Sequence, residues 1–233
     1  GISVKGFADK LFSDTNFQAV WFSDEITSIT SGLFYGNTNI RYVDGLGIKE
    51  IQDESFYNCS RLYTVNFPEV IEIGKKAFYG TTQLSGISFE DCTLIEQYAF
   101  YGSIIRYVDL PNVKTICAYA FEKCPCIYSF NVSELIELRG RLYKDGVWYA
   151  DNRFLQQASV YDVLNFENLK SIPYGCFYQA NIKRIEFSNI KSIGSLPITY
   201  CKKPFYGSIT IVLPSTLEEC GLDADKYKVG DFL

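Results

Sequence analysis

A short pattern of apolar residues recurs along the chain. Each copy reads aliphatic, two variable residues, aliphatic, one variable residue and a final apolar residue. The clearest copies occupy residues 62–67, 84–89, 105–110, 127–132 and 182–187. The last two apolar positions alternate with a polar one, so their side chains point to the same face of a strand. The pattern predicts short β-strands that stack in parallel, about 4.8 Å apart, as neighbours in one sheet.

A second pattern lies between the predicted strands. Phe34, Phe56, Phe78, Phe100 and Phe121 follow one another at intervals of 22, 22, 22 and 21 residues, and an Ile precedes each by five positions. About nine copies can be counted, whereas a solenoid needs roughly three to bury its own core. We expect each Ile and Phe to pack behind the strands, where a buried Phe stabilises the fold by about 1.5–3 kcal/mol. Each copy therefore depends on its neighbour to complete its core.

The segment "VIEIGKKAFYGTTQLSGISF", residues 70–89, resembles the BspA-like leucine-rich repeat family. The units of that family read I-x-x-I-x-x-x-A-F-x-x-C-x-x-L-x-x-I-x-[LF]-P. Ala77-Phe78 matches the Ala-Phe pair and Pro68 follows a strand, whereas Thr81 replaces the Cys. The resemblance covers roughly residues 17–215. It implies an α/β-type repeat solenoid: a leucine-rich repeat with one parallel sheet, mostly β-strands and turns, and short irregular or helical returns.

The repeat spacing also divides the chain. We expect one solenoid domain over residues 1–233, with the repeats at about 17–215. The flanking segments, at about 1–16 and 216–233, read as caps, and the first of them is compatible with a short amphipathic helix. A longer interval around Asp145-Gly146, a turn signal between aromatic runs, predicts a β-hairpin insertion at about 140–162.

Composition narrows the function. The chain is 47% hydrophobic and 21% charged with a net charge of −5, which is ordinary for a folded soluble protein. It has no basic cluster suited to nucleic acid, and no apolar run of the roughly 18–20 residues that cross a bilayer. Because the chain opens with Gly1 instead of Met, we expect that a targeting segment has been removed.

Cysteine and histidine usage bears on chemistry. Cys92 and Cys176 occupy repeat positions that elsewhere hold Val and Ala, so they read as small buried hydrophobes. The pattern favours free thiols, and it leaves open disulfides among the remaining candidates, Cys117, Cys124, Cys126, Cys201 and Cys220. His is absent, which removes Ser-His-Asp triads and most zinc sites. We therefore expect a protein that is not an enzyme and has no cofactor or metal.

A solenoid sheet offers a long binding face. Trp21, Tyr42 and Tyr107 fall at outward positions that we take as equivalent, and outward aromatics are common interface anchors. The alternative is that these rings only cover their neighbours along the sheet. Further candidates are the charged pair Arg184 and Glu186 on a late strand, and Trp148 and Tyr149 on the hairpin.

The resemblance implies an extracellular or cell-surface protein that attaches to host or neighbouring cells. Its partner would then be a protein, such as a host surface or matrix protein. Two alternatives stay open: a structural scaffold or assembly subunit, and a glycan-binding module that uses Trp148 and Tyr149.

Overall fold

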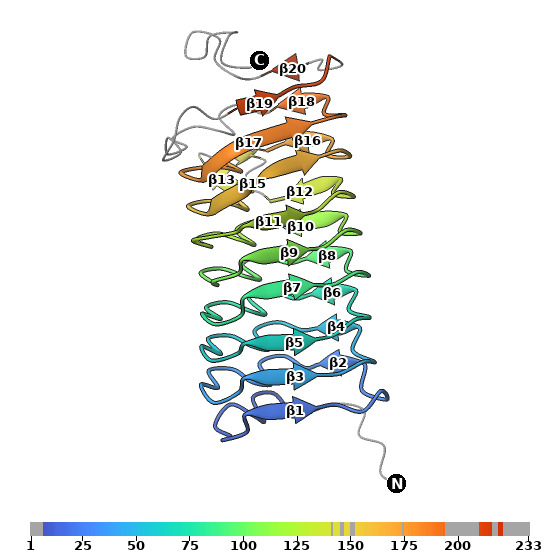
Figure 1. Ribbon diagram of the computed structural model, residues 1–233, viewed down its shortest axis with the longest axis vertical. Coiled ribbons are helices and arrows are strands. Elements are labelled where there is room, and N and C mark those ends of the chain that lie inside the picture. Colours follow the sequence, from blue (N-terminus) through green and yellow to red (C-terminus); the bar gives the residue numbers. More distant parts are fainter. Residues whose placement is uncertain are drawn as a thin grey trace.

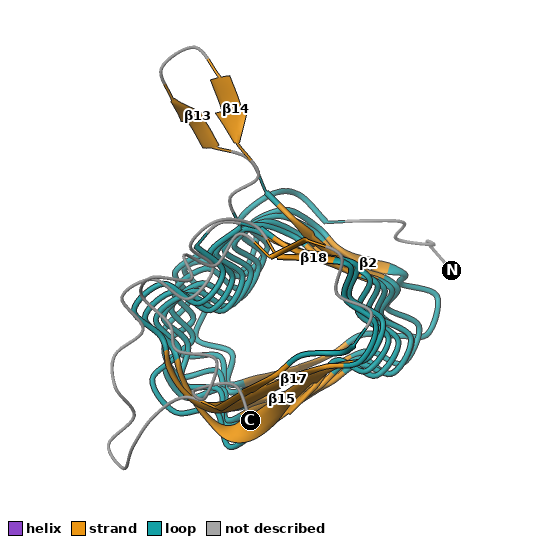
Figure 2. Ribbon diagram, turned by 90° about the horizontal axis from the view of Figure 1, so that it is seen from above, coloured by secondary structure: helices purple, strands orange, loops and turns teal. Residues whose placement is uncertain are grey.

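The computed structural model is a solenoid of stacked coils with strands on two opposite walls (Figures 1 and 2). It describes residues 7–140, 142–144, 147–149, 152–173, 175–193, 210–215 and 219–220. The strands of one wall, called here the front row, are β1 (Ala19–Trp21), β3 (Tyr42–Asp44), β5 (Thr64–Asn66), β7 (Gly86–Ser88), β9 (Tyr107–Asp109), β11 (Ser129–Asn131), β15 (Ser159–Phe166), β17 (Asn181–Phe187) and β19 (Thr210–Val212).

The front row confirms the predicted strands and their parallel stacking. Val43 of β3 faces Val20 of β1 on one side and Val65 of β5 on the other, one repeat apart in each case. The row is nevertheless divided into three sheets, β1-β3-β5, β7-β9-β11 and β15-β17-β19. The prediction that residues 62–67 and 84–89 are paired neighbours is therefore wrong, because no hydrogen bond joins β5 to β7.

A second wall, the rear row, was not predicted. Its strands are β2 (Ser28–Ile29), β4 (Glu50–Ile51), β6 (Glu72–Ile73), β8 (Leu94–Ile95), β10 (Thr115–Cys117), β12 (Glu137–Arg139), β16 (Ser171–Ile172), β18 (Ser192–Ile193) and β20 (Glu219–Cys220). The first six form one continuous parallel sheet. These strands contain the Ile or Leu that precedes each Phe of the regular coils, so the expectation of one sheet is corrected to two rows.

The returns between the rows are tight turns, and the described residues contain no helix. The expected helical returns and the amphipathic N-terminal helix are therefore not found there; residues 9–14 form turns. The cause is local backbone geometry. Glu54 and Asn58, on either side of Phe56, have φ of 57° and 55°, in the left-handed region. Two such residues in one turn reverse the chain before a helix can begin.

The column of Phe rings explains why the repeat needs an aromatic at this position. Phe34, Phe56, Phe78, Phe100 and Phe121 are fully buried, and successive ring centroids lie 5.1, 5.0, 5.2 and 5.1 Å apart. Their planes are within 12° of parallel. The ring spacing is close to the spacing of hydrogen-bonded strands, so ring stacking and strand pairing favour the same distance between coils.

The Cys position of the repeat has a hydrogen-bonding role. Cys59 Sγ donates to the carbonyl of Phe34 at 3.0 Å, and Cys124 Sγ donates to that of Phe100 at 3.2 Å. Ser103 replaces Cys and makes the same contact, 2.7 Å from its Oγ to the Phe78 carbonyl. Thr81 Oγ1 lies 2.9 Å from Ser103 Oγ. The position therefore requires a small buried donor, and Cys, Ser and Thr all supply one.

The insertion leaves the solenoid as a hairpin. Strands β13 (Leu142–Lys144) and β14 (Val147–Tyr149) pair antiparallel and project outward on the rear side (Figure 2). Phe154 then resumes the coil, because its carbonyl accepts a hydrogen bond from the amide of Phe121. The insertion thus ends earlier than the expected boundary near residue 162. Most of the expected C-terminal cap, 216–233, lies outside the described residues.

Replacement of Phe78 by Ala should lower the free energy of unfolding by about 3–5 kcal/mol, because it leaves a cavity between two stacked rings. Phe17→Ala is the control, since Phe17 is 52% exposed and its loss should cost less than about 1 kcal/mol. Urea unfolding followed by circular dichroism measures both values. Equal urea midpoints for the two variants would show that the stacked Phe rings do not stabilise the core.

Gly47→Ala should destabilise the protein by about 3 kcal/mol, the upper end of the cost of overpacking. A Cβ at Gly47 would lie 2.2 Å from the backbone oxygen of Asp24 in the preceding coil. Gly86→Ala is the matched control, because its Cβ would meet Tyr107 at an ordinary 3.6 Å and should change stability by less than about 1 kcal/mol. Thermal unfolding of both variants tests this, and a stable Gly47→Ala protein would contradict the close approach.

Candidate binding surfaces

The outer face of the front row carries the aromatic residues expected there, with one correction. Tyr42 pairs with Ala19 and Thr64, whereas Trp21 pairs with Asp44. Trp21 therefore occupies the other outward position of the strand and is not equivalent to Tyr42 or Tyr107. The Trp21 and Tyr42 rings nevertheless meet diagonally, with centroids 5.7 Å apart, and Trp21 is 67% exposed.

A larger aromatic group crosses the middle of the front row. Tyr107 lies 6.5 Å from Tyr128, and Tyr128 lies 5.3 Å from Tyr161, measured between ring centroids. Each of these three side chains is at least 50% exposed. We call Tyr107, Tyr128 and Tyr161 the tyrosine cluster. It supplies adjacent exposed rings that each carry a hydroxyl group, a combination suited to protein recognition.

Sequence reasoning missed Tyr128 and Tyr161, and also Tyr63, which is 61% exposed. All three directly follow the first aliphatic residue of the strand pattern. Only the alternating residues after that position were considered outward. The first variable position of the pattern is also exposed: Tyr63 and Tyr128 directly precede β5 and β11, and Tyr161 lies near the start of the longer β15. An aromatic residue at that position is the signal that would have found them.

Polar side chains at the ends of the front strands form an ordered row beside the rings. Asn66 Nδ2 donates to Asp44 Oδ1 at 2.5 Å, and Asn131 Nδ2 donates to Asp109 Oδ1 at 2.7 Å. Ser88 Oγ donates to Asp109 Oδ2 at 3.2 Å. These contacts hold both carboxylates in fixed directions at the surface.

The remaining predicted candidates lie away from these rings or pair with each other. Arg184 Nε donates to Glu186 within β17, so the two charges neutralise one another at a partly exposed site. Trp148 and Tyr149 belong to β14, which stands on the opposite side of the coil from β15 and β17 (Figure 2). The structure thus separates the hairpin from the front row, and their side chains lie outside the described part.

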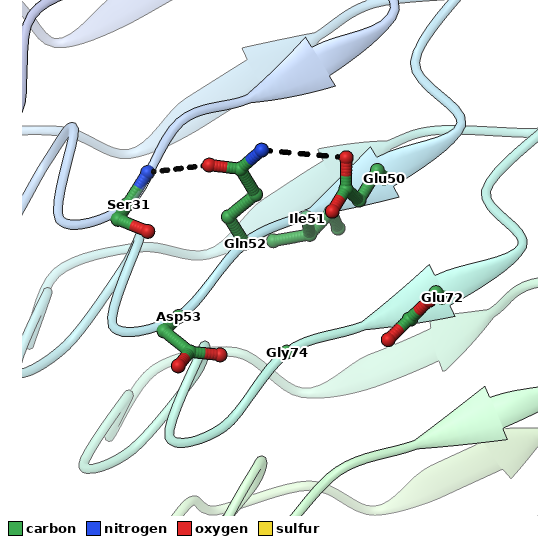
Figure 3. Close-up of a pocket in the computed structure, with 7 residues that line it drawn as sticks. All are labelled: Ser31, Glu50, Ile51, Gln52, Asp53, Glu72 and Gly74. Atoms are coloured by element: carbon green, nitrogen blue, oxygen red, sulfur yellow. Dashed lines mark hydrogen bonds between the residues drawn. The ribbon is translucent and has the colours of Figure 1, made fainter.

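A shallow pocket of about 240 Å³ opens on the rear row (Figure 3). It is lined by Ser31, Glu50, Ile51, Gln52, Asp53, Glu72 and Gly74. Gln52 bridges the upper side, accepting from the amide of Ser31 at 3.2 Å and donating to Glu50 Oε2 at 3.3 Å. Partial burial, together with the nearby carboxylates of Glu50, Glu96 and Asp53, raises the pKa of Glu72. In the described part of the chain, no three His, Cys, Asp or Glu side chains form a group that could hold a metal ion.

Six cysteines fall where their side chains are described, and none of the six forms a disulfide. Burial raises the pKa of Cys92 and of Cys117 to about 12, which keeps both as neutral thiols at physiological pH. Cys126 is the one described cysteine with a partly exposed side chain. Cys117, Cys124 and Cys126 therefore form no disulfide, whereas Cys201 and the side chain of Cys220 lie outside the described residues.

The chain matches a known family of repeat proteins. The family model of the BspA type leucine rich repeat region matches in six copies, over residues 5–128 and 128–204. No curated protein matches the chain. Within the described residues, no helix is long and apolar enough to cross a membrane.

Two solved structures are similar in fold. A leucine-rich repeat protein from Bacteroides ovatus is 18% identical with a TM-score of 0.50, and the match covers 84% of this chain and 64% of that one. A leucine rich cell surface protein from Faecalibacterium prausnitzii is 17% identical with a TM-score of 0.44, and the match covers 98% of this chain and 84% of that one. At 18% identity, the likeness to the Bacteroides ovatus protein concerns the fold alone.

Glu72→Gln should raise the melting temperature at pH 7, because it removes a charge that the rear row disfavours. A folded pKa above the unfolded value means that ionised Glu72 destabilises the protein at neutral pH. The gain should shrink as pH falls through the raised pKa and vanish below the ordinary value of 4.5. Scanning calorimetry between pH 3 and pH 7 measures it. A gain that is independent of pH would contradict the electrostatic cause.

Proposed function

Because the chain belongs to the BspA-type leucine-rich repeat family, we propose that it is a non-enzymatic, cell-surface binding module whose front row binds a protein on a host or neighbouring cell. Leucine-rich repeats are interaction platforms, since their stacked strands present a long regular surface. Adhesion through such a contact is the role that this proposal assigns to the chain.

The observation that carries the proposal is the tyrosine cluster. Tyr107 lies in β9, Tyr128 directly precedes β11 and Tyr161 lies in β15, and each side chain is about half exposed. Exposed aromatic residues that lie together contribute most of the binding energy in many protein interfaces. The polar row at Asp109 and Asn131 lies beside the cluster and would form the hydrated rim of the contact.

The hairpin is the competing location. It projects from the rear side, so a ligand that uses Trp148 and Tyr149 approaches from a different direction than one on the front row (Figure 2). A glycan ligand would favour that location if hairpin aromatics stacked on sugar rings. The two locations can therefore be separated by mutation.

The test measures binding to a panel of purified matrix and cell-surface proteins, each with and without enzymatic deglycosylation. Tyr107→Ala and Tyr128→Ala should each weaken binding at least fivefold, which corresponds to about 1 kcal/mol. Trp21→Ala and Tyr42→Ala are measured in the same binding assay and test the second aromatic pair of the same face. All four variants should keep the wild-type melting temperature within about 2 °C, since exposed side chains carry little of the core.

Leu46→Ala is the matched control, because Leu46 is 48% exposed but lies in the turn after β3 and not on the front row. It should leave binding unchanged. Loss of binding only in Trp148→Ala and Tyr149→Ala, or only after deglycosylation, would overturn the proposal in favour of the hairpin or a glycan ligand.

A further inference from the structure

The front row contains an opening between β5 and β7. At the flanking junctions, the amide of Thr64 donates to the carbonyl of Arg41 at 3.1 Å, and that of Tyr107 donates to Ser85 at 3.3 Å. The equivalent amide of Gly86 has no such bond to Tyr63. Gly45 and Phe89 likewise donate to the next strand, at 3.1 and 3.0 Å, whereas the equivalent amide of Phe67 does not. Figure 1 shows β5 and β7 further apart than β3 and β5.

The opening is local to the front row. Behind it, β4 and β6 remain paired, and the Phe56 and Phe78 rings are stacked 5.0 Å apart. Tyr57 and Tyr79 are stacked beside them at 4.8 Å. The two coils are therefore in contact at the rear strands and along both ring columns, while β5 and β7 remain unpaired. Val65, which faces the opening, is only partly buried, whereas its equivalents Val43 and Ile87 are buried.

Two strand edges thus face each other without partners. In the parallel register of the neighbouring strands, the amides of Val65, Phe67, Gly86 and Ser88 point into the opening, and so do the carbonyls of Tyr63, Val65, Gly86 and Ser88. None of these amides donates a hydrogen bond to another residue of the described chain. Donors and acceptors that alternate at strand spacing on both sides are matched by one kind of ligand, an extended peptide backbone.

We propose that this opening accepts one extended segment of a protein partner, which adds a parallel strand between β5 and β7. Five residues of that segment would satisfy the eight free backbone groups. The inference rests on the proposed function and refines it, because it states how the front row recognises a protein. Insertion moves the two edges to about 9.6 Å apart, twice the usual strand spacing. The intact pairing of β4 with β6 provides the hinge for that movement.

The surrounding side chains define the chemistry of the segment. Its third residue would point inward between Val65 and Ile87 and so should be Val or Ile. Its second residue would lie beside Gly86, where the missing side chain leaves room for an aromatic ring. The strands one further out on each side, β3 and β9, are preceded by Arg41 and Arg106, both exposed, and their long cationic side chains favour an acidic first residue.

The opposite ends of the same strands carry Asp44 and Asp109, which favour a basic fourth residue. None of these four flanking charges takes part in an ion pair within the described residues. The expected segment is therefore acidic, aromatic, β-branched, basic and apolar in order, and the acetylated, amidated peptide Asp-Tyr-Val-Lys-Val is the probe.

Amide hydrogen exchange followed by NMR tests the opening and the peptide together. In the free protein, the amides of Val65, Phe67, Gly86 and Ser88 should have protection factors at least 100-fold below those of Thr64 and Tyr107. Saturating peptide should raise the four factors at least tenfold. The same peptide N-methylated at its third residue, the central Val, should bind at least tenfold more weakly, because it loses a central hydrogen-bond donor.

Charge reversal supplies an independent readout. Arg41→Glu combined with Arg106→Glu should weaken binding of the probe at least fivefold, and replacement of the peptide Asp by Lys should restore it. Val163→Ala is the control. It should leave peptide binding within twofold, because Val163 is 40% exposed and lies in β15, away from β5 and β7.

Protection of the four amides equal to that of Thr64 and Tyr107 in the free protein would overturn the proposal, and so would peptide addition that leaves them unprotected. These outcomes are distinct from failure of the proposed function. If the peptide fails while Tyr107→Ala and Tyr128→Ala still weaken a protein partner, strand addition is wrong and the front row remains the binding face. If binding maps to the hairpin, the proposed function is wrong whatever the exchange data show.

Discussion

The fold depends on one constraint: every coil must repeat the previous one at the spacing of hydrogen-bonded strands. Parallel pairing in the rear row and the stacked Phe column both satisfy that spacing, on different sides of the coil. Each coil therefore gains its hydrogen bonds and its buried apolar contacts from the same two neighbours. This is the physics of a one-dimensional array, in which stability is a sum over coils and their interfaces.

The two rows differ in how regularly their strands are paired. The rear row is continuous from β2 to β12, and its strands are only two or three residues long. The front row is interrupted between β5 and β7, although the coils behind it remain in contact. The continuous rear wall and the interrupted front wall thus place the break in strand pairing on the face that also carries the exposed tyrosines.

Much of the fold could be predicted because its information is periodic. The positions of Val43, Phe56 and Phe78 follow from spacing alone, and so do the front strands that contain or adjoin them. The rear row was missed because a strand of two residues, such as Glu72–Ile73, is too short to show alternation. Helical returns were expected from the family pattern, but left-handed residues such as Glu54 cannot be recognised from residue type.

The candidate site was less predictable, for a physical reason. Whether Trp21 and Tyr42 occupy equivalent positions depends on register, and a shift of two residues along a strand preserves the face while changing the neighbours. The tyrosine cluster requires Tyr128 and Tyr161 to be exposed at the first variable position of the pattern, which the alternation rule for the later positions does not cover. The opening between β5 and β7 has no sequence signal that we recognise, because the interval from Val65 to Ile87 equals that of paired strands.

The central claim, that each coil is held only by its two neighbours, is tested most directly by removal of one complete period. Deletion of residues 57–78 joins Phe56 to Tyr79 and leaves the repeat pattern uninterrupted. Near-ultraviolet circular dichroism, recorded while the shortened chain unfolds in urea, measures both its native aromatic signal and the cooperativity of its unfolding. The account predicts that the shortened chain retains a native aromatic signal and unfolds in one cooperative transition, with a lower free energy of unfolding. A chain without aromatic signal or cooperative transition would contradict it.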